Sequence, residues 1–158
     1  MHRIHINIGS NQGDRQTLIE SAVALISREW PDARLSRSDF FESEPWGFES
    51  DNSFVNLALM LETDACAGPL DILRRLQAIE RRISPDPHRD SLGNYIDRMI
   101  DIDLIAVDSL VVDTPELTLP HPRMRGRDFV MKPLRSLDPS WVDPVTGMTA
   151  EEIVRKEF

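Results

Sequence analysis

The chain of 158 residues has one cysteine, Cys66, one tyrosine and only 6% aromatic residues. A single cysteine excludes an intramolecular disulfide and any metal or redox site built on paired cysteines. No apolar run approaches the roughly 18 residues that cross a membrane, and the opening MHRIHINIGS lacks the apolar stretch of a signal peptide. We therefore expect a cytoplasmic protein without a membrane partner, folded as a single domain over residues 1–158 and monomeric.

Basic residues are also scarce, because 18 Lys and Arg stand against 27 Asp and Glu, a formal net charge of −9. Proteins that bind nucleic acid through its phosphates need a cationic surface, so this balance argues against a nucleic-acid partner. It is compatible with a small phosphorylated ligand, since a local arginine cluster or a magnesium ion serves a few phosphates.

Several catalytic motifs are absent as well. The turn GSNQGD has neither the G-K-[ST] ending of a P-loop nor the glycine spacing of a dinucleotide-binding fold. There is no G-x-S-x-G sequence, and the four histidines have no zinc-ligand spacing. Nucleophilic catalysis therefore has little support.

What is present is a regular succession of apolar patterns. Alternating and helical periodicities predict strand, helix, strand, strand, helix and strand, in that order, followed by a hairpin in VVDTPELTLP and a short helix from Thr149. This order predicts an α+β fold, a ferredoxin-like βαββαβ sandwich whose largely antiparallel sheet has helices on one face, with a C-terminal hairpin and helical extension. The expected elements cover residues 3–8, 14–29, 34–41, 54–63, 68–83 and 98–107.

The strand RMIDIDLIAV (98–107) carries two carboxylates on one face, because Asp101 and Asp103 are two residues apart. Their side-chain bases would lie about 6–7 Å apart. With an effective dielectric constant of about 20, the two charges would repel by roughly 2.5 kcal/mol. Two interpretations stand: a solvated face paired with an arginine such as Arg98, or a pair that holds divalent cations.

A polar loop over 84–97 and three arginines further on, Arg123, Arg125 and Arg127, accompany these carboxylates. Carboxylates and arginines near a long loop are the parts of metal-assisted phosphoryl chemistry. Taken singly, each part also has an ordinary structural explanation, such as a solvated arginine or an amide that satisfies a neighbouring backbone group.

In chain order, INIGSN, SEPWG, FVNLALMLET, DRMIDIDLI and LPHPRMRGRDFVMKPL resemble the hydroxymethyl-dihydropterin pyrophosphokinase family, from residue 4 to about 139. That family transfers a pyrophosphoryl group from ATP to 6-hydroxymethyl-7,8-dihydropterin in folate biosynthesis, releasing AMP. The resemblance implies a magnesium-dependent pyrophosphokinase with ATP as co-substrate and two Mg²⁺ ions held by Asp101 and Asp103.

The resemblance also assigns the remaining site residues. The pterin would stack between two aromatic rings and be recognised by an asparagine and by a loop, in positions that match Phe54, Phe129, Asn56, Ser43 and Trp46. The positions that match the ATP-binding residues are Glu80, Arg98, His121 and Arg127. Phe54 and Asn56 would cooperate because alternate residues of a strand share a face.

Residues 84–97 depart from the family pattern, since an arginine that many members have after the second helix is missing. Tyr95 replaces a common tryptophan, and Asp97 replaces a usual proline. We expect Arg89 to reach the phosphates in its place, with His88 as the alternative, and Arg98 to act as the other catalytic cation. The loop would then close over the substrates. Two other hypotheses remain open: a catalytically silent binding module on the same scaffold, and an RNA-binding sheet.

Overall fold

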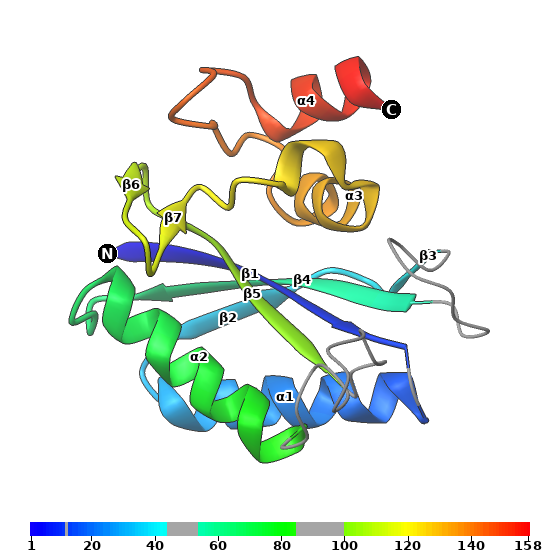
Figure 1. Ribbon diagram of the computed structural model, residues 1–158, viewed down its shortest axis with the longest axis vertical. Helices are drawn as coiled ribbons and strands as arrows, with labels where there is room; N and C mark the ends of the chain where they lie inside the picture. Colours follow the sequence, from blue (N-terminus) through cyan, green and yellow to red (C-terminus); the bar gives the residue numbers. More distant parts are fainter. Residues whose placement is uncertain (12, 44–53, 85–99) are drawn as a thin grey trace.

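The computed structural model describes residues 1–11, 13–43, 54–84 and 100–158. Within them the predicted order of elements is confirmed, with a C-terminal hairpin and a final helix (Figure 1). The strands are β1 (His2–Ser10), β2 (Arg34–Arg37), β3 (Phe41–Ser43), β4 (Phe54–Thr63), β5 (Asp101–Val107), β6 (Val112–Asp113) and β7 (Thr118–Leu119). The helices are α1 (Arg15–Glu29), α2 (Pro69–Ile83), the 3₁₀ turn η1 (Met124–Gly126), α3 (Asp128–Leu137) and α4 (Ala150–Glu157).

The main sheet has the order β2-β4-β1-β5, and each neighbouring pair is antiparallel. β1 and β2, joined through α1, therefore run parallel with β4 between them, which is the split βαβ arrangement that the sequence predicts. The expected strand over 34–41 is interrupted, and its end forms β3, which pairs with the start of β4. β6 and β7 form a separate hairpin, as predicted.

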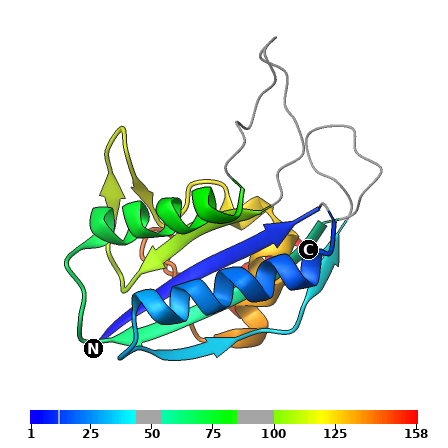
Figure 2. The same cartoon turned by 90° about the horizontal axis from the view of Figure 1, so that it is seen from below.

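One face of the sheet is apolar and carries the main core. Along β1 the residues Ile4, Ile6 and Ile8 are buried on this face, and Leu57 and Leu59 of β4 join them. The helices α1 and α2 lie across this face, side by side (Figures 1 and 2). The strict alternation of isoleucine with polar residues in β1 explains why this side faces the helices.

The opposite face carries a second helical layer, so the expectation of helices on one face only is wrong for the C-terminal part. α3 packs against β4 and β3, and α4 packs on α3 (Figure 1). A smaller apolar cluster fills the space beneath them; it includes Ile105, Met124, Val130, Met131, Leu134, Trp141 and Ile153. The sequence patterns predict no helix at α3, which directly follows the three arginines.

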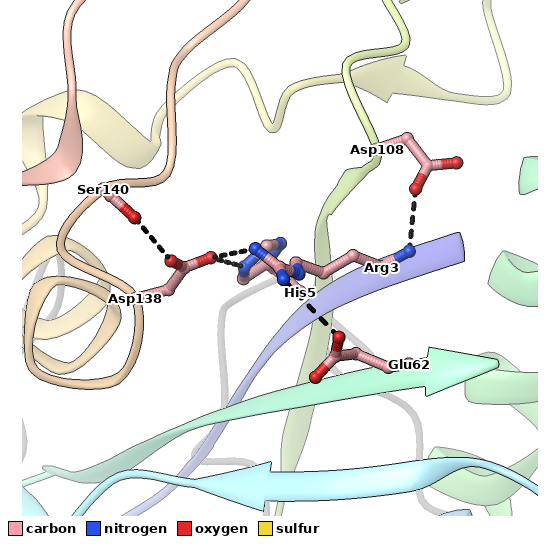
Figure 3. A network of polar contacts seen from close by, with 6 residues as sticks. All are labelled: Arg3, His5, Glu62, Asp108, Asp138 and Ser140. Atoms are coloured by element: carbon pink, nitrogen blue, oxygen red, sulfur yellow. Dashed lines mark hydrogen bonds and ion pairs between the residues drawn. The ribbon is translucent and has the colours of Figure 1, made fainter. Parts of the chain in front are cut away.

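A polar network ties this second layer to the sheet (Figure 3). His5 Nε2 lies 2.9 Å from Oδ2 of Asp138, the C-cap residue of α3, and an Arg3 nitrogen lies 3.4 Å from the same oxygen. The hydrogen bond from His5 lowers the pKa of Asp138 and outweighs the burial that would raise it. The second layer is therefore anchored by charge as well as by apolar contact.

Two helix starts follow the sequence signals. Asp14 caps α1, and its side chain accepts a hydrogen bond from the backbone N–H of Thr17. Thr149 and Glu152 form the predicted capping box of α4. No helix in the described part of the chain is long and apolar enough to cross a membrane.

Candidate active site

A group of polar residues occupies one end of the sheet face that α3 partly covers. Their backbones lie in register across three strands: Asp101 of β5 is opposite Gly9 of β1, and Gly9 is opposite Asn56 of β4. One step further along, Asp103 is opposite Asn7. We call the following residues the polar half-face: Asn7, Gly9, Phe54, Asn56, Asp101 and Asp103. The register brings together residues far apart in sequence, as the family resemblance implies.

The two carboxylates lie on β5, which is an edge strand of the sheet. Ile102 between them points into the main core, so Asp101 and Asp103 share the opposite face. On the outer edge, the backbone N–H of Ile102 donates a hydrogen bond of 2.8 Å to Glu80 Oε2 of α2. Glu80 therefore helps to fix the segment of β5 that carries both aspartates, a role that its sequence position did not reveal.

The two carboxylates suit a cation that prefers oxygen ligands and takes only some of them from the protein. Among the described residues, no group of three or more His, Cys, Asp or Glu side chains is placed to hold a metal. Two carboxylates supply only part of the six-oxygen sphere of Mg²⁺, which commonly takes its other ligands from water and substrate phosphates. The residues present thus fit a magnesium ion that arrives with a nucleotide, rather than a permanently caged metal.

Asn56 is 3% exposed, and its Nδ2 atom is buried with no hydrogen-bond partner among the described residues. A buried amide without an acceptor costs about 1–3 kcal/mol unless a ligand supplies one. Its other terminal atom lies over Gly9, where a Cβ atom would come 2.5 Å from Asn56 Oδ1. Gly9 is therefore required for the placement of Asn56, and this amide is available to recognise a ligand.

Phe129 lies in the first turn of α3 and packs against the edge of the second apolar cluster. Its carbonyl accepts a hydrogen bond of 3.0 Å from Nδ2 of Asn7, which is 4% exposed. The guanidinium carbon of Arg127 is 5.5 Å from the centre of the Phe129 ring, a cation–π contact. The backbone of Phe129 thus contacts the polar half-face from the second layer, and its ring contacts Arg127.

The surroundings of His121 shift the pKa of its ring. Its backbone N–H donates to the carbonyl of Ile105 in β5. Burial, with Arg127 and Arg123 adding to the effect, lowers its pKa to about 4, although Asp101 acts in the opposite sense. Its Nδ1 accepts from the backbone N–H of Arg123 at 3.2 Å. A neutral ring with this contact carries its proton on Nε2, so His121 can donate one hydrogen bond to a ligand oxygen at neutral pH.

The structure separates the three arginines of the basic segment. Arg125 pairs with Asp143, whose side chain is fully buried, and so holds the loop before α4. Arg123 is exposed, while Arg127 contacts Phe129. Arg127 is the arginine of the three whose side chain contacts the ring of a predicted site residue, and it is the one that the resemblance selects.

Four of the predicted site residues have limited or no description. Trp46, Arg89 and Arg98 lie outside the described residues, as does the alternative His88. Ser43 is described only through its backbone, which is opposite Phe54 in the pairing of β3 with β4. Their roles stay predictions.

Sequence reasoning missed Asn7 and Gly9. Both stand on the polar side of the β1 alternation, and a glycine inside a strand often marks a place where another group approaches closely. That signal identifies Gly9, but only the cross-strand register shows that the approaching group is Asn56.

Comparison with known proteins gives a consistent result. Residues 5–139 match the family model of 7,8-dihydro-6-hydroxymethylpterin-pyrophosphokinase. The 2-amino-4-hydroxy-6-hydroxymethyldihydropteridine pyrophosphokinase of Porphyromonas gingivalis is 40% identical over 142 residues, which are 89% of this chain and 93% of the relative. The enzyme of the same name from Bacillus subtilis is 32% identical over 133 residues, 84% of this chain and 76% of the relative.

Solved structures agree on the fold. The crystal structure of wild-type Plasmodium falciparum HPPK-DHPS superposes with a TM-score of 0.75 over 98% of this chain, at 13% sequence identity. At that identity the likeness shows the fold alone. The chain spans 44% of the length of that protein.

Proposed function

We propose that the polar half-face performs the reaction of the 7,8-dihydro-6-hydroxymethylpterin-pyrophosphokinase family, to which the chain belongs. That reaction is ATP-dependent pyrophosphoryl transfer to 6-hydroxymethyl-7,8-dihydropterin in folate biosynthesis. In this proposal it uses two Mg²⁺ ions. The observation that carries this proposal is the register that brings Asp101, Gly9 and Asn56 into one row across the sheet. A carboxylate for the metal and an amide for the acceptor substrate then lie on either side of Gly9 in the same row.

The pterin binds at the β4 end of this row. The ring of Phe129 supplies one stacking surface, and Phe54, which shares a strand face with Asn56, supplies the other. The buried Nδ2 atom of Asn56 donates to an acceptor of the heterocycle. A ring that lacks this acceptor leaves the amide unsatisfied, which gives the site its selectivity. Ser43 and Trp46 complete the pocket, as the family resemblance implies.

The nucleotide binds at the β5 end. Asp101 and Asp103 would hold the two ions, which would offset the negative charge of the phosphates. Neutral His121 donates from Nε2 to a phosphate oxygen, and Arg127 adds a positive charge beside it. Glu80 fixes β5 through Ile102 N–H, and its contact with the nucleotide is what the family resemblance implies. Arg98, Arg89 and the loop over 84–97 complete the phosphate contacts.

The reaction is an in-line displacement at the β-phosphorus. The pterin hydroxyl oxygen forms the new O–P bond, the bond between the β-phosphorus and the bridging oxygen to the α-phosphate breaks, AMP leaves, and the hydroxyl proton passes to solvent. Phosphoryl transfer of this kind depends mainly on position and charge and needs no strong base. The row across the sheet serves that need, because it fixes acceptor and nucleotide on one rigid surface.

Metal removal tests the finer part of this proposal. Treatment with EDTA should abolish AMP formation in the presence of ATP and the pterin alcohol, and added Mg²⁺ should restore it. Asp101→Asn should raise the Mg²⁺ concentration needed for half-maximal activity by at least about tenfold, since it removes a charged ligand. Full activity in EDTA would contradict the magnesium assignment while leaving the family assignment intact.

A further inference from the structure

α3 contains a proline at an interior position, Pro133. In an α-helix each backbone N–H donates to the carbonyl four residues earlier, and a proline has no N–H. The carbonyl four residues before Pro133 belongs to Phe129. The helix itself therefore cannot supply the usual donor to that carbonyl.

Asn7 supplies a donor instead. Its Nδ2 atom lies 3.0 Å from the carbonyl oxygen of Phe129, and the side chain is 4% exposed, so water competes little for this contact. A carbonyl that loses its donor in a place that water does not reach destabilises the fold. The side-chain amide of Asn7 in β1 thus replaces the helical hydrogen bond that Pro133 cannot donate.

The same strand also holds the other end of α3. His5 and Arg3, which alternate with Asn7 on one face of β1, reach the C-cap residue Asp138 (Figure 3). α3 is therefore fastened to β1 at its first turn by Asn7 and at its last by His5 and Arg3. Of these contacts, only that of Asn7 is made to the residue that carries the stacking ring.

We propose that Asn7 is a positioning residue for the pterin, because it holds the backbone of Phe129 through the hydrogen bond that Pro133 cannot donate. This inference rests on the proposed role of Phe129 as a stacking ring. Loss of the contact frees the first turn of α3 to shift, which moves the ring relative to Asn56 and Phe54. Asp101 and Asp103 lie on β5, which this bond does not hold, and of the proposed nucleotide residues only Arg127 contacts the Phe129 ring. ATP binding should therefore be affected less than pterin binding.

The test is a double-mutant cycle of Asn7→Leu and Pro133→Ala, followed by calorimetric titration. Each protein is titrated with 6-hydroxymethyl-7,8-dihydropterin in the presence of Mg²⁺ and a non-hydrolysable ATP analogue, and separately with the analogue. Asn7→Leu should weaken pterin binding by about tenfold, the change that one lost hydrogen bond of about 1.4 kcal/mol produces. Affinity for the ATP analogue should change by less than about twofold, on the same conversion.

Pro133→Ala restores an N–H that can donate to the carbonyl of Phe129. In that background Asn7→Leu should weaken pterin binding by less than about threefold, because the helix now supplies the missing donor. A tenfold loss in both backgrounds would overturn the inference, as would an equal loss of affinity for both ligands. If Asn7→Leu does not fold, Asn7→Ala removes the amide without adding bulk. It should show the same losses of pterin affinity, with and without Pro133→Ala.

Two further variants separate this inference from the proposed function. Thr63→Val, at the far end of the sheet, also removes one hydrogen bond between a buried side chain and the backbone, and it should lower stability without changing pterin affinity. Phe129→Ala removes the ring itself. If Phe129→Ala leaves pterin affinity unchanged, the proposed site is wrong; if it weakens binding while Asn7→Leu does not, only the positioning role is wrong.

Discussion

The two faces of β1 differ in what their residues accomplish. On one face Ile4, Ile6 and Ile8 are buried under α1 and α2 and contact only the apolar core. On the other face Arg3 and His5 share the carboxylate of Asp138, Asn7 donates to the carbonyl of Phe129, and Gly9 leaves room for a side chain of β4. The nine residues of β1 thus provide a uniform apolar surface on one face and several specific polar contacts on the other.

This difference shows where stability and specificity reside. Burial of isoleucine is non-directional and contributes about 2 kcal/mol per side chain, so the apolar face tolerates exchange among similar residues. Each contact on the polar face depends on a particular atom at a particular distance, and Asn56 keeps a buried donor without a partner in the described protein. We expect changes on the apolar face to affect stability and changes on the polar face to affect the reaction.

The largest effect is expected from the carboxylates. Asp103→Ala should lower kcat by about a thousandfold, which corresponds to about 4 kcal/mol of transition-state stabilisation. Its free energy of unfolding should not fall, because removal of one charge relieves the repulsion between the two aspartates. Steady-state kinetics and urea denaturation measure both quantities.

Glu62→Ala is the matched control for that variant, since Glu62 lies on the same sheet face at the other end and pairs with Arg3. Its kcat should stay within about twofold of wild type, because the pair it breaks is partly exposed and weak. Near-full activity of Asp103→Ala, or a comparable loss in Glu62→Ala, would remove the distinction between the two ends of the face.

The apolar face should respond in the opposite way. Leu57→Ala removes a fully buried side chain and should lower the free energy of unfolding by about 2–5 kcal/mol. The folded fraction should keep its kcat, since Leu57 points away from the polar half-face. Kinetics at a temperature well below the unfolding transition would contradict this account if kcat fell more than about threefold, about 0.65 kcal/mol.

Gly9→Ala places a methyl group where Asn56 Oδ1 would be 2.5 Å away, so the amide must move. We expect KM for the pterin to rise about tenfold while the free energy of unfolding changes by only about 1 kcal/mol. Gly126→Ala is the control, because a Cβ there meets nothing within 4 Å. An unchanged KM for Gly9→Ala would show that the position of Asn56 does not matter for the substrate.

The smallest effect concerns His121, whose pKa falls from 6.5 to about 4 in the folded protein. Because the unfolded chain takes up a proton at higher pH than the folded one, His121 contributes stability above about pH 6.5 that is lost as pH falls towards 4. His121→Asn should therefore have a flatter profile of unfolding free energy across this window. Denaturation at several pH values measures how the free energy of unfolding depends on pH. A pH dependence equal to that of the wild-type protein would contradict the lowered pKa of His121.

Much of the fold could be predicted from the sequence. The bounds of β4 and the start of α2 agree with the expected ones, because alternation and a proline at the helix start are local signals. α3 could not be predicted in this way. Pro133 disfavours a helix in an isolated peptide. In the folded protein α3 is stabilised by its contacts with β4 and by the hydrogen bond from Asn7 of β1, which is more than a hundred residues away in sequence.

The site was predictable to a similar degree. Strand alternation predicts that Asp101 and Asp103 share a face, and the structure confirms it. The contact of Glu80 with Ile102 N–H and the support of Phe129 by Asn7 could not be foreseen, because both depend on which strands become neighbours. Neither contact leaves a local pattern in the sequence.

We propose above that the polar half-face binds the pterin through Asn56. Calorimetric titration of Asn56→Leu with 6-hydroxymethyl-7,8-dihydropterin, in the presence of Mg²⁺ and a non-hydrolysable ATP analogue, tests this role. We expect at least a tenfold loss of pterin affinity, about 1.4 kcal/mol, with affinity for the ATP analogue unchanged within about twofold. Pterin affinity equal to that of the wild-type protein would contradict it.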